Sequence, residues 1–427
     1  MAQRGKRKPR LGVLVGGGPA PGINGVIGAV TMEAHRLGVE VVGIYDGFRW
    51  LARGDTDHVT PLTPEVVDGP RLRGGSMLHT SRENPTKSAK AMANVVGALE
   101  ELGVKHLVTI GGDDTAFSAY KTWERTRGAI SVAHVPKTVD NDLPLPGAAP
   151  TFGFRTACHV GGALVRNLRE DARTTRRWYL VVAMGRSAGH LALGMASAGG
   201  AALAVIPEEF AGRSLSLEGL CQLIEASMYK AKALGRDHGV VVVAEGVAEL
   251  MKSDLEAHPF AVSEVDEHGH PRLSEVPLAL IIKRALAHRA AERGKKRTIV
   301  DVTIGYELRC ADPIAFDIEY THQLGWGAVR YLLQAGEASG KAAGALISIQ
   351  HGELMPIPLP DILDVKTGRT EVRRVNLESD VTRAAFDQMI RLEAADLKSR
   401  ESLARLAEAA ELTPKQFREQ YGHLVEL

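Results

Sequence analysis

The sequence predicts an α/β fold in which parallel β-sheets are covered by helices on both faces. Short, continuously apolar runs alternate with segments of helical length along most of the 427-residue chain. Strands without a polar face need cover on both sides, which is typical of parallel sheets. A chain of this length exceeds the usual size of one domain, so two lobes are expected.

The start of the chain shows this alternation most clearly. An apolar run at 11–15 is followed by a glycine-rich loop at 16–22, a helical pattern to about Leu37 and a second strand-like run at 39–44. This order predicts a βαβ unit. Further strand-like runs lie at 106–110, 130–135, 179–183, 202–206, 240–244, 298–304 and 345–350. From about 379 to 411 the sequence is charged and helical in pattern, which predicts an added C-terminal helical region.

The composition excludes several classes of partner. The chain has 52 basic and 51 acidic residues, a balance that argues against nucleic acid or a membrane surface as the main partner. Residues 1–10 are expected to form a basic, solubilising tail with no secretory pattern. The widely spaced Cys158, Cys221 and Cys310 are expected to be reduced thiols of a cytoplasmic protein.

Two glycine loops follow strand-like runs and suit phosphate groups. Gly17 and Gly18 stand in the first, and Gly112 with Asp113, Asp114 and Thr115 in the second. Glycines let the backbone approach an anion closely, and a helix start offers unpaired N–H groups. In the second loop Asp113 offers an oxygen to Mg²⁺, and Thr115 could serve as both N-cap and phosphate donor. Tight structural turns, with simple capping by Asp114 or Thr115, are the alternative.

A pair of carboxylates follows the strand at 130–135. Asp140, Asn141 and Asp142 come at the end of this apolar run, which is where open α/β sheets place their active sites. We interpret them as a candidate catalytic base with a companion. A solvated turn is the alternative, since Asn and Asp favour turns in any protein.

Three more strand ends carry residues suited to a sugar phosphate. Met184, Gly185 and Arg186 follow one strand, Glu245 follows a second, and the segment 306–309 follows a third. Arginine can hold a phosphate through two hydrogen bonds, and carboxylates can hold hydroxyl groups. A surface salt bridge would explain the arginine equally well. Together with the glycine loops, these residues predict a protein that binds a phosphorylated polyol.

Five of these motifs, in order, closely resemble the motif series of the phosphofructokinases. They are the segments 16–24 (GGGPAPGIN), 111–114 (GGDD), 136–142 (PKTVDND), 184–186 (MGR) and 306–309 (YELR). The resemblance covers about residues 10 to 335 and implies two Rossmann-like parallel-sheet lobes of the phosphofructokinase fold. It implies a phosphoryl-donor lobe at 11–155 with part of the C-terminal region, and a sugar-phosphate lobe at 156–335 with an insertion at 246–275. A C-terminal strand and helical extension would occupy 336–427.

The resemblance also implies roles for individual residues. Asp140 would take the proton from the sugar hydroxyl, Asp142 would support it, and Asp113 would bind Mg²⁺. Thr138 and Arg186 complete the implied catalytic set. The implied donor-binding residues are Gly17, Gly18, Arg82, Gly112, Asp114, Thr115 and Lys137. The implied substrate-binding residues are Thr138, Val139, Asp140, Arg177, Met184, Gly185, Arg186, Glu245, Tyr306, Glu307, Leu308 and Arg309.

Arg177 matches an arginine that the family lends across a subunit interface. The resemblance therefore implies a homodimer or homotetramer with active sites at the interface. Tyr306 stands where the family usually has histidine, which leaves the stringency for fructose 6-phosphate open. Another arginine of the family falls on Val300, and Arg297 is the nearest substitute.

Two departures from the usual motifs predict the phosphoryl donor. Members that use ATP typically have glycine where this chain has Asp114, and many have glycine where it has Lys137. A carboxylate at the first position fills the space of an α-phosphate and repels it, while lysine at the second supplies a cation. The pair resembles pyrophosphate-dependent members, which would transfer phosphate reversibly to fructose 6-phosphate. The alternatives are an ATP-dependent member, a sedoheptulose 7-phosphate kinase, or a non-catalytic regulatory subunit.

Overall fold

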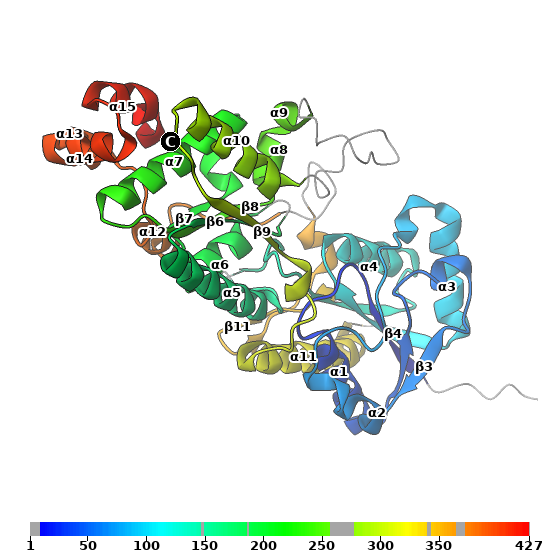
Figure 1. The fold of residues 1–427 in the computed structure, drawn as a ribbon. Helices are drawn as coiled ribbons and strands as arrows, with labels where there is room; N and C mark the ends of the chain where they lie inside the picture. The colour runs from blue at the N-terminus through cyan, green and yellow to red at the C-terminus, as the bar shows by residue number, and fades with distance from the viewer. Residues whose placement is uncertain are drawn as a thin grey trace, which may run out of the picture. The chain divides into compact units, whose positions relative to one another are not determined.

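The computed structural model describes residues 9–146, 149–185, 188–256, 277–339, 343–363 and 372–426 (Figure 1). The chain divides into two units. Unit 1 comprises Met1–Ala157 with Glu307–Arg373, and unit 2 comprises Cys158–Tyr306 with Arg374–Leu427. Most of the predicted 246–275 insertion and most of the N-terminal tail lie outside the described residues.

The first predicted lobe boundary, at 155, lies two residues from the observed division, but the later boundaries differ. The chain returns to unit 1 at Glu307 rather than ending the second lobe at 335, because helix α11 (Ala315–Ser339) packs along α1 (Ile23–Arg36). Unit 1 includes part of the C-terminal region, as predicted for the first lobe, and the rest of the predicted 336–427 extension, from Arg374 on, belongs to unit 2.

Unit 1 is built on a seven-stranded sheet in the order β13-β10-β5-β4-β1-β2-β3. The inner strands β10, β5, β4, β1 and β2 run parallel, whereas the edge strands β3 and β13 are antiparallel to their neighbours. The strands are β1 (Arg10–Val15), β2 (Glu40–Ile44), β3 (Val59–Leu62), β4 (Val104–Gly111), β5 (Ser131–Pro136), β10 (Gly344–Leu346) and β13 (Ile357–Pro358). A small hairpin pairs β11 (Ile349–Gln350) with β12 (Glu353–Leu354).

Helices cover both faces of this sheet because its strands are apolar on both. In β1, Leu11, Val13 and Val15 pack in one core with α1 and α11, while Leu14 packs in a second core with α3 and α4. Successive side chains of a strand point to opposite faces, so one continuous apolar run supplies both cores. The remaining helices of unit 1 are α2 (Pro64–Asp68), α3 (Ala89–Glu101) and α4 (Asp113–Arg125).

Unit 2 contains a four-stranded parallel sheet in the order β7-β8-β6-β9. Its strands are β6 (Trp178–Ala183), β7 (Leu203–Val205), β8 (Gly239–Ala244) and β9 (Ile299–Ile304). Helix α5 (Phe154–Thr175) starts at the unit boundary and precedes β6. The helices between these strands are α6 (His190–Gly199), α7 (Leu217–Ala233), α8 (Val247–Leu250), α9 (Lys252–Glu256) and α10 (Leu278–Glu292). Parallel sheets with helical connections are therefore present in both units, and the predicted fold class is confirmed.

The C-terminal residues form four helices rather than one continuous helical segment. They are α12 (Asp380–Asp387), α13 (Ala394–Lys398), α14 (Arg400–Ala410) and α15 (Pro414–Tyr421). In Figure 1, α14 and α15 lie beside α7, where Phe417, Tyr421 and Leu406 enter a shared apolar cluster. None of the helices in the described ranges combines the length and apolar sequence that a bilayer crossing would need.

Candidate active site

Three predicted loops of unit 1 converge because their strands are parallel neighbours. β5, β4 and β1 lie side by side in the sheet, so the loops that follow them leave from the same edge. Gly16 donates its N–H to the Ile110 carbonyl at 2.8 Å, and Lys137 donates its N–H to the Gly111 carbonyl at 2.8 Å. The structure thus brings together the two glycine loops and the carboxylate turn.

The Lys137 side chain joins two of these loops. It is 5% exposed, and its ammonium donates a hydrogen bond to the Gly18 carbonyl. Burial, and secondarily the nearby Arg309 guanidinium, lowers the pKa of Lys137 to about 8. The carboxylates of Asp140 and Asp142 act in the opposite direction and favour the charged form. The site therefore contains a buried cation beside the first glycine loop.

The carboxylate turn is held by its own polar side chains. Asp140 donates its N–H to the Thr138 hydroxyl at 3.0 Å, and the Thr151 hydroxyl donates to the Thr138 carbonyl at 2.7 Å. Between the two aspartates, Asn141 has a left-handed backbone with φ of 57°, a conformation that asparagine tolerates better than most residues. Burial raises the pKa of Asp142, and the field of a second carboxylate, Asp113, raises it further.

The second glycine loop differs from its prediction in one respect. Helix α4 begins at Asp113 with Gly112 as its N-cap, so neither Asp114 nor Thr115 caps it. Thr115 is 6% exposed. A Cβ atom added to Gly16 or to Gly111 would lie 2.4 Å from the Thr115 hydroxyl oxygen. The glycines are needed because Thr115 packs onto both strand ends. The prediction that Thr115 is an N-cap is wrong.

The first glycine loop is shaped by backbone conformations that favour glycine. Gly17 and Gly22 have φ values of 81° and 99°, and Gly22 is the N-cap of α1. Gly17 donates its N–H to the Ser81 carbonyl at 2.8 Å, which brings the following residue, Arg82, close to the loop. The backbone before Arg82 therefore pairs with Gly17, and the donor-binding role of Gly17, Gly18 and Arg82 stays a prediction.

Arg309 lies beside this loop, although the motif comparison grouped it with the sugar-phosphate pocket. The central carbon of its guanidinium lies 3.5 Å from where a Cβ of Gly18 would be. Leu308 is fully buried and Val139 is 5% exposed, so both side chains are almost inaccessible to a ligand. Glu307, by contrast, is exposed.

Unit 2 collects four of the predicted sugar-phosphate residues, Met184, Gly185, Glu245 and Tyr306, where its parallel strands end. Glu245 donates its N–H to the Ala183 carbonyl at 2.8 Å, and Met184 donates its N–H to the Ile304 carbonyl at 3.0 Å. Gly185 accepts from the N–H after Glu245 at 3.1 Å, and Tyr306, 75% exposed, follows β9 at this edge. Arg186 lies outside the described residues.

Arg177 is separated from this group within the chain. It precedes β6, whereas Met184 follows it, so the two lie at opposite edges of the sheet, roughly 20 Å apart for a strand of this length. Arg297 does not lie at this edge either, because it precedes β9 and lies 3.8 Å from the buried Glu225 carboxylate.

Three polar residues outside the predicted set support the loops, of which His134 and Glu208 are buried and Arg373 is partly exposed. His134, fully buried, contacts the Thr109 hydroxyl through Nδ1 at 2.9 Å and the Gly111 carbonyl through Nε2 at 3.1 Å. In unit 2, Glu208 accepts the N–H of Gly189, just after the Met184 loop, at 3.0 Å. In unit 1, the Arg373 guanidinium donates to the Asn141 carbonyl in the carboxylate turn at 3.0 Å. Of these three residues, only His134 could have been noticed from the sequence, because it is a histidine inside an apolar strand-like run.

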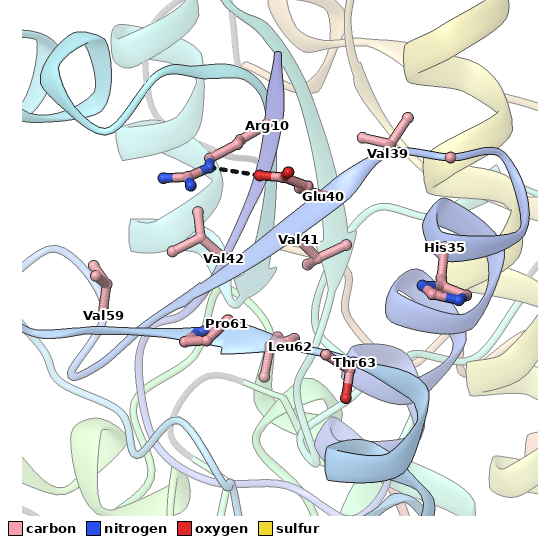
Figure 2. A pocket seen from close by; sticks show the side chains of 11 residues that line it. Arg10, His35, Val39, Glu40, Val41, Val42, Val59, Pro61, Leu62 and Thr63 are labelled. Carbon is pink, nitrogen blue, oxygen red and sulfur yellow. Dashed lines mark hydrogen bonds and ion pairs between the residues drawn. The ribbon is translucent and has the colours of Figure 1, made fainter. Parts of the chain in front are cut away.

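A cavity of about 470 Å³ lies near the beginnings of β1 and β2 in unit 1, away from the ends of the strands where the loops converge (Figure 2). Arg10 and Glu40, at the first residues of β1 and β2, form an ion pair of 3.1 Å in its wall. The other lining side chains are mostly aliphatic, including Val41, Val42 and Leu62. Because its cation is already paired and it lies away from the converging loops, we do not assign the phosphate site to this cavity.

Comparison with known proteins identifies close relatives. The family model described as Phosphofructokinase matches residues 10–332. The chain is 53% identical over 419 residues to pyrophosphate–fructose 6-phosphate 1-phosphotransferase of Thermotoga maritima, covering 98% of this chain and 99% of the relative. It is 45% identical over 429 residues to the protein of the same name from Naegleria fowleri, covering 99% and 97%.

Solved structures of known proteins share this fold. Phosphofructokinase from Saccharomyces cerevisiae superposes with a TM-score of 0.66 at 21% identity, covering 98% of this chain and 50% of the yeast chain. This chain therefore spans half the length of the yeast chain. Pyrophosphate-dependent phosphofructokinase from Marinobacter aquaeolei superposes with a TM-score of 0.65 at 17% identity, covering 91% and 93%.

Proposed function

This chain belongs to the phosphofructokinase family, and we propose that it transfers a phosphoryl group reversibly from pyrophosphate to the 1-hydroxyl of fructose 6-phosphate. The products would be fructose 1,6-bisphosphate and phosphate. Two relatives that match this chain over nearly its whole length carry the name of this activity. The structural observation that carries the proposal is the buried Lys137 ammonium at the Gly18 carbonyl.

The donor follows from the charges around the two glycine loops. Lys137 places a cation where a donor of only two phosphates would lie, with Arg309 beside the same loop. Asp114, exposed in the first turn of α4, presents a carboxylate where an α-phosphate of ATP would need space. Pyrophosphate has no third phosphate and no nucleoside, so it avoids this repulsion.

The carboxylates of the turn are suited to deprotonating the sugar hydroxyl. Phosphoryl transfer needs an in-line arrangement of nucleophile and leaving group, charge neutralisation and a base for the nucleophile. Asp140 would accept the hydroxyl proton, with Asp142 supporting it and Thr138 contacting the substrate. Burial raises the pKa of Asp142, so this carboxyl binds a proton more readily than a solvated one.

Mg²⁺ fits the donor set of unit 1. The mutual repulsion of Asp113 and Asp142, which raises the pKa of Asp142, is the arrangement that a divalent cation relieves. The described residues contain no cluster of three or more side-chain ligands, and Mg²⁺ commonly takes one or two carboxylates together with substrate phosphates. Asp113 would hold the ion, which would neutralise charge on the transferring phosphoryl group.

The sugar phosphate would bind at the second sheet edge. Met184, Gly185, Glu245 and Tyr306 meet there, and Arg186 follows Met184 in sequence. Because Arg177 lies at the opposite edge of the same sheet, it could reach a sugar phosphate only from another copy of the chain. We therefore propose a homodimer or homotetramer in which Arg177 acts across the interface.

The proposed setting is the cytoplasm, where the reaction would serve glycolysis or gluconeogenesis. Within the described residues Cys158, Cys221 and Cys310 are not joined in disulfide bonds, and the first two are buried whereas Cys310 is exposed. Free thiols fit a reducing compartment.

A donor-by-acceptor activity matrix tests the function. Purified protein with Mg²⁺ is assayed with pyrophosphate or ATP against fructose 6-phosphate or sedoheptulose 7-phosphate. We expect turnover with pyrophosphate and fructose 6-phosphate, and activity with ATP alone would overturn the donor assignment. An Asp114→Gly, Lys137→Gly double variant should lose pyrophosphate use. Asp140→Ala should lower turnover by several orders of magnitude. If the chain were a non-catalytic regulatory subunit, the same substitution would leave its binding role unchanged.

A further inference from the structure

Arg373 donates several hydrogen bonds to the turn that carries Asp140 and Asp142. Its Nε donates to the Asn141 carbonyl at 3.0 Å, Nη1 donates to the Ala149 carbonyl at 2.7 Å, and Nη2 donates to Asn141 Oδ1. Its backbone N–H donates to the Asp142 carbonyl at 2.7 Å. One residue, 232 positions away in sequence from Asn141, therefore supplies four donors to the turn or its flank.

These contacts fix the part of the turn with the least common backbone conformation. Asn141 is 7% exposed and lies between the two catalytic aspartates with its φ of 57°. Its side-chain oxygen also accepts the Thr151 N–H at 3.0 Å, so it joins Arg373 to the segment that returns behind the turn. Asp140 and Asp142 flank Asn141 directly, so a shift of this residue moves both carboxylates.

The planar fork of arginine is suited to this task. Three acceptors at fixed positions are met by three N–H groups of one rigid guanidinium. Lysine has a single ammonium on a flexible stem and cannot reach all three in this geometry. The buried Tyr320 contributes to the electrostatic surroundings of the guanidinium, and burial lowers the pKa of Arg373 from its usual range while leaving it charged at neutral pH.

Arg373 also acts on the charge state of the supporting carboxylate. Its positive field lowers the pKa of Asp142, against the larger opposing effects of burial and of Asp113. Further charged groups near this turn are Asp140 and Lys137, and Arg309 in turn acts on Lys137. Removal of the Arg373 charge would therefore raise the pKa of Asp142 further.

We propose that Arg373 is a positioning residue for phosphoryl transfer, which holds the Asp140–Asn141–Asp142 turn in its reactive geometry from a segment far along the chain. The proposal rests on the proposed function of this site. It assigns a role in the chemistry to a segment beyond the region that matches the family model, which ends at residue 332.

The test compares three variants in the pyrophosphate assay. Arg373→Met keeps the aliphatic stem and removes the donors and the charge, whereas Arg373→Lys keeps the charge. Arg383→Met is the matched control, because Arg383 is a half-exposed arginine that pairs with surface carboxylates at Glu378 and Asp380. Turnover, the KM of both substrates, the pH profile of kcat and the melting temperature are measured for each.

We expect Arg373→Met to lower kcat on the order of 10²-fold, because small displacements of reacting groups have effects of this size. KM should change by no more than about threefold, since the loss falls on the transition state rather than on binding. The acid limb of the profile should move to higher pH in Arg373→Met and much less in Arg373→Lys. The control should match the wild type.

The outcomes separate the inference from the function on which it rests. A wild-type protein that is inactive with pyrophosphate and fructose 6-phosphate refutes the proposed function. An active wild type with unchanged kcat in Arg373→Met refutes the positioning role alone. The positioning role is also refuted if kcat falls only in proportion to the melting temperature and the acid limb of the pH profile does not move. That result would show that Arg373 only stabilises the fold. If Arg373→Met does not fold, Arg373→Lys decides through its kcat, which should fall about tenfold with KM retained.

Discussion

The ammonium of Lys137, which follows strand β5, donates a hydrogen bond to the backbone carbonyl of Gly18 in the loop after β1. The contact joins two motifs that are more than a hundred residues apart in the chain, and it encloses the cation almost completely. A buried cation next to a glycine loop is an arrangement for a compact, highly charged anion. The same burial makes the charge of Lys137 depend on pH.

Use of pyrophosphate should decline on the alkaline side near pH 8. Burial and Arg309 lower the pKa of Lys137 to about 8 in the free protein, so the ammonium is lost as the pH rises through this value. We expect kcat/KM for pyrophosphate, which reports the free enzyme, to fall above pH 8. When pyrophosphate is saturating, its negative charge keeps Lys137 protonated. The kcat/KM for fructose 6-phosphate should therefore not fall above pH 8. The same limb in both profiles would contradict the assignment to Lys137.

The Lys137→Met variant should be more stable than the wild type at neutral pH. The folded pKa of about 8 lies below the unfolded value of 10.5, so this group favours folding only at high pH, and the benefit is lost as the pH falls through 8. At pH 7 the protein carries a buried charge that methionine would remove, for a gain of roughly 1 to 3 kcal/mol. Melting temperatures at pH 7 and pH 10.5 measure this, and the difference should shrink at the higher pH. A variant less stable at pH 7 would contradict it.

His134 should make the fold sensitive to acid. The Gly111 carbonyl can only accept, so Nε2 carries the proton and Nδ1 accepts from Thr109, which is the neutral form. Burial lowers the pKa of His134 to about 3. Between pH 6.5 and 3 the unfolded chain binds a proton that the folded chain does not, so stability falls as the pH is lowered.

His134→Phe should therefore lose less stability between pH 7 and pH 5 than the wild type, by about 2 kcal/mol. At pH 7 the variant should itself be less stable, because Thr109 and Gly111 lose their partner. Urea unfolding at the two pH values measures both effects. His288→Phe is the control, since His288 is 75% exposed on α10, and it should leave the pH dependence unchanged. Equal losses in wild type and His134→Phe would contradict the prediction.

Glu225→Gln should strongly destabilise unit 2. Glu225 on α7 is fully buried and lies 3.0 Å from Arg289, with Arg293 and Arg297 within 3.8 Å. The Tyr421 hydroxyl of α15 donates to the same carboxylate at 3.0 Å, so this group attaches a C-terminal helix to α7.

The variant would leave three arginines without their shared counter-charge, at a cost of about 3 to 5 kcal/mol in the free energy of unfolding. Glu218→Gln is the matched control, because Glu218 pairs with the same Arg289 at 3.2 Å but is 69% exposed. The control should cost less than about 1 kcal/mol. Denaturant unfolding compares the two, and equal effects would show that burial does not set the strength of this cluster.

The fold class and the location of the site were predictable because their signals are local. Apolar runs of strand length identify parallel strands covered on both faces, and active-site residues of such sheets follow strand ends. Gly18, Asp113 and Asp140 each come directly after or close to such a run, and the structure brings their loops to one edge. No knowledge of long-range contacts was needed for these predictions.

The amino-acid sequence by itself determined the alternation of buried strands with helices, the motifs at the strand ends and the unusual pair Asp114 and Lys137. Tertiary structure alone decided that Lys137 reaches Gly18, that Thr115 packs onto two glycines and that Arg309 lies beside the first loop. It alone placed Arg373 on Asn141, 232 residues away. The physical reason is that hydrophobic periodicity is read from neighbouring residues, whereas a buried hydrogen bond depends on packing that brings distant segments together.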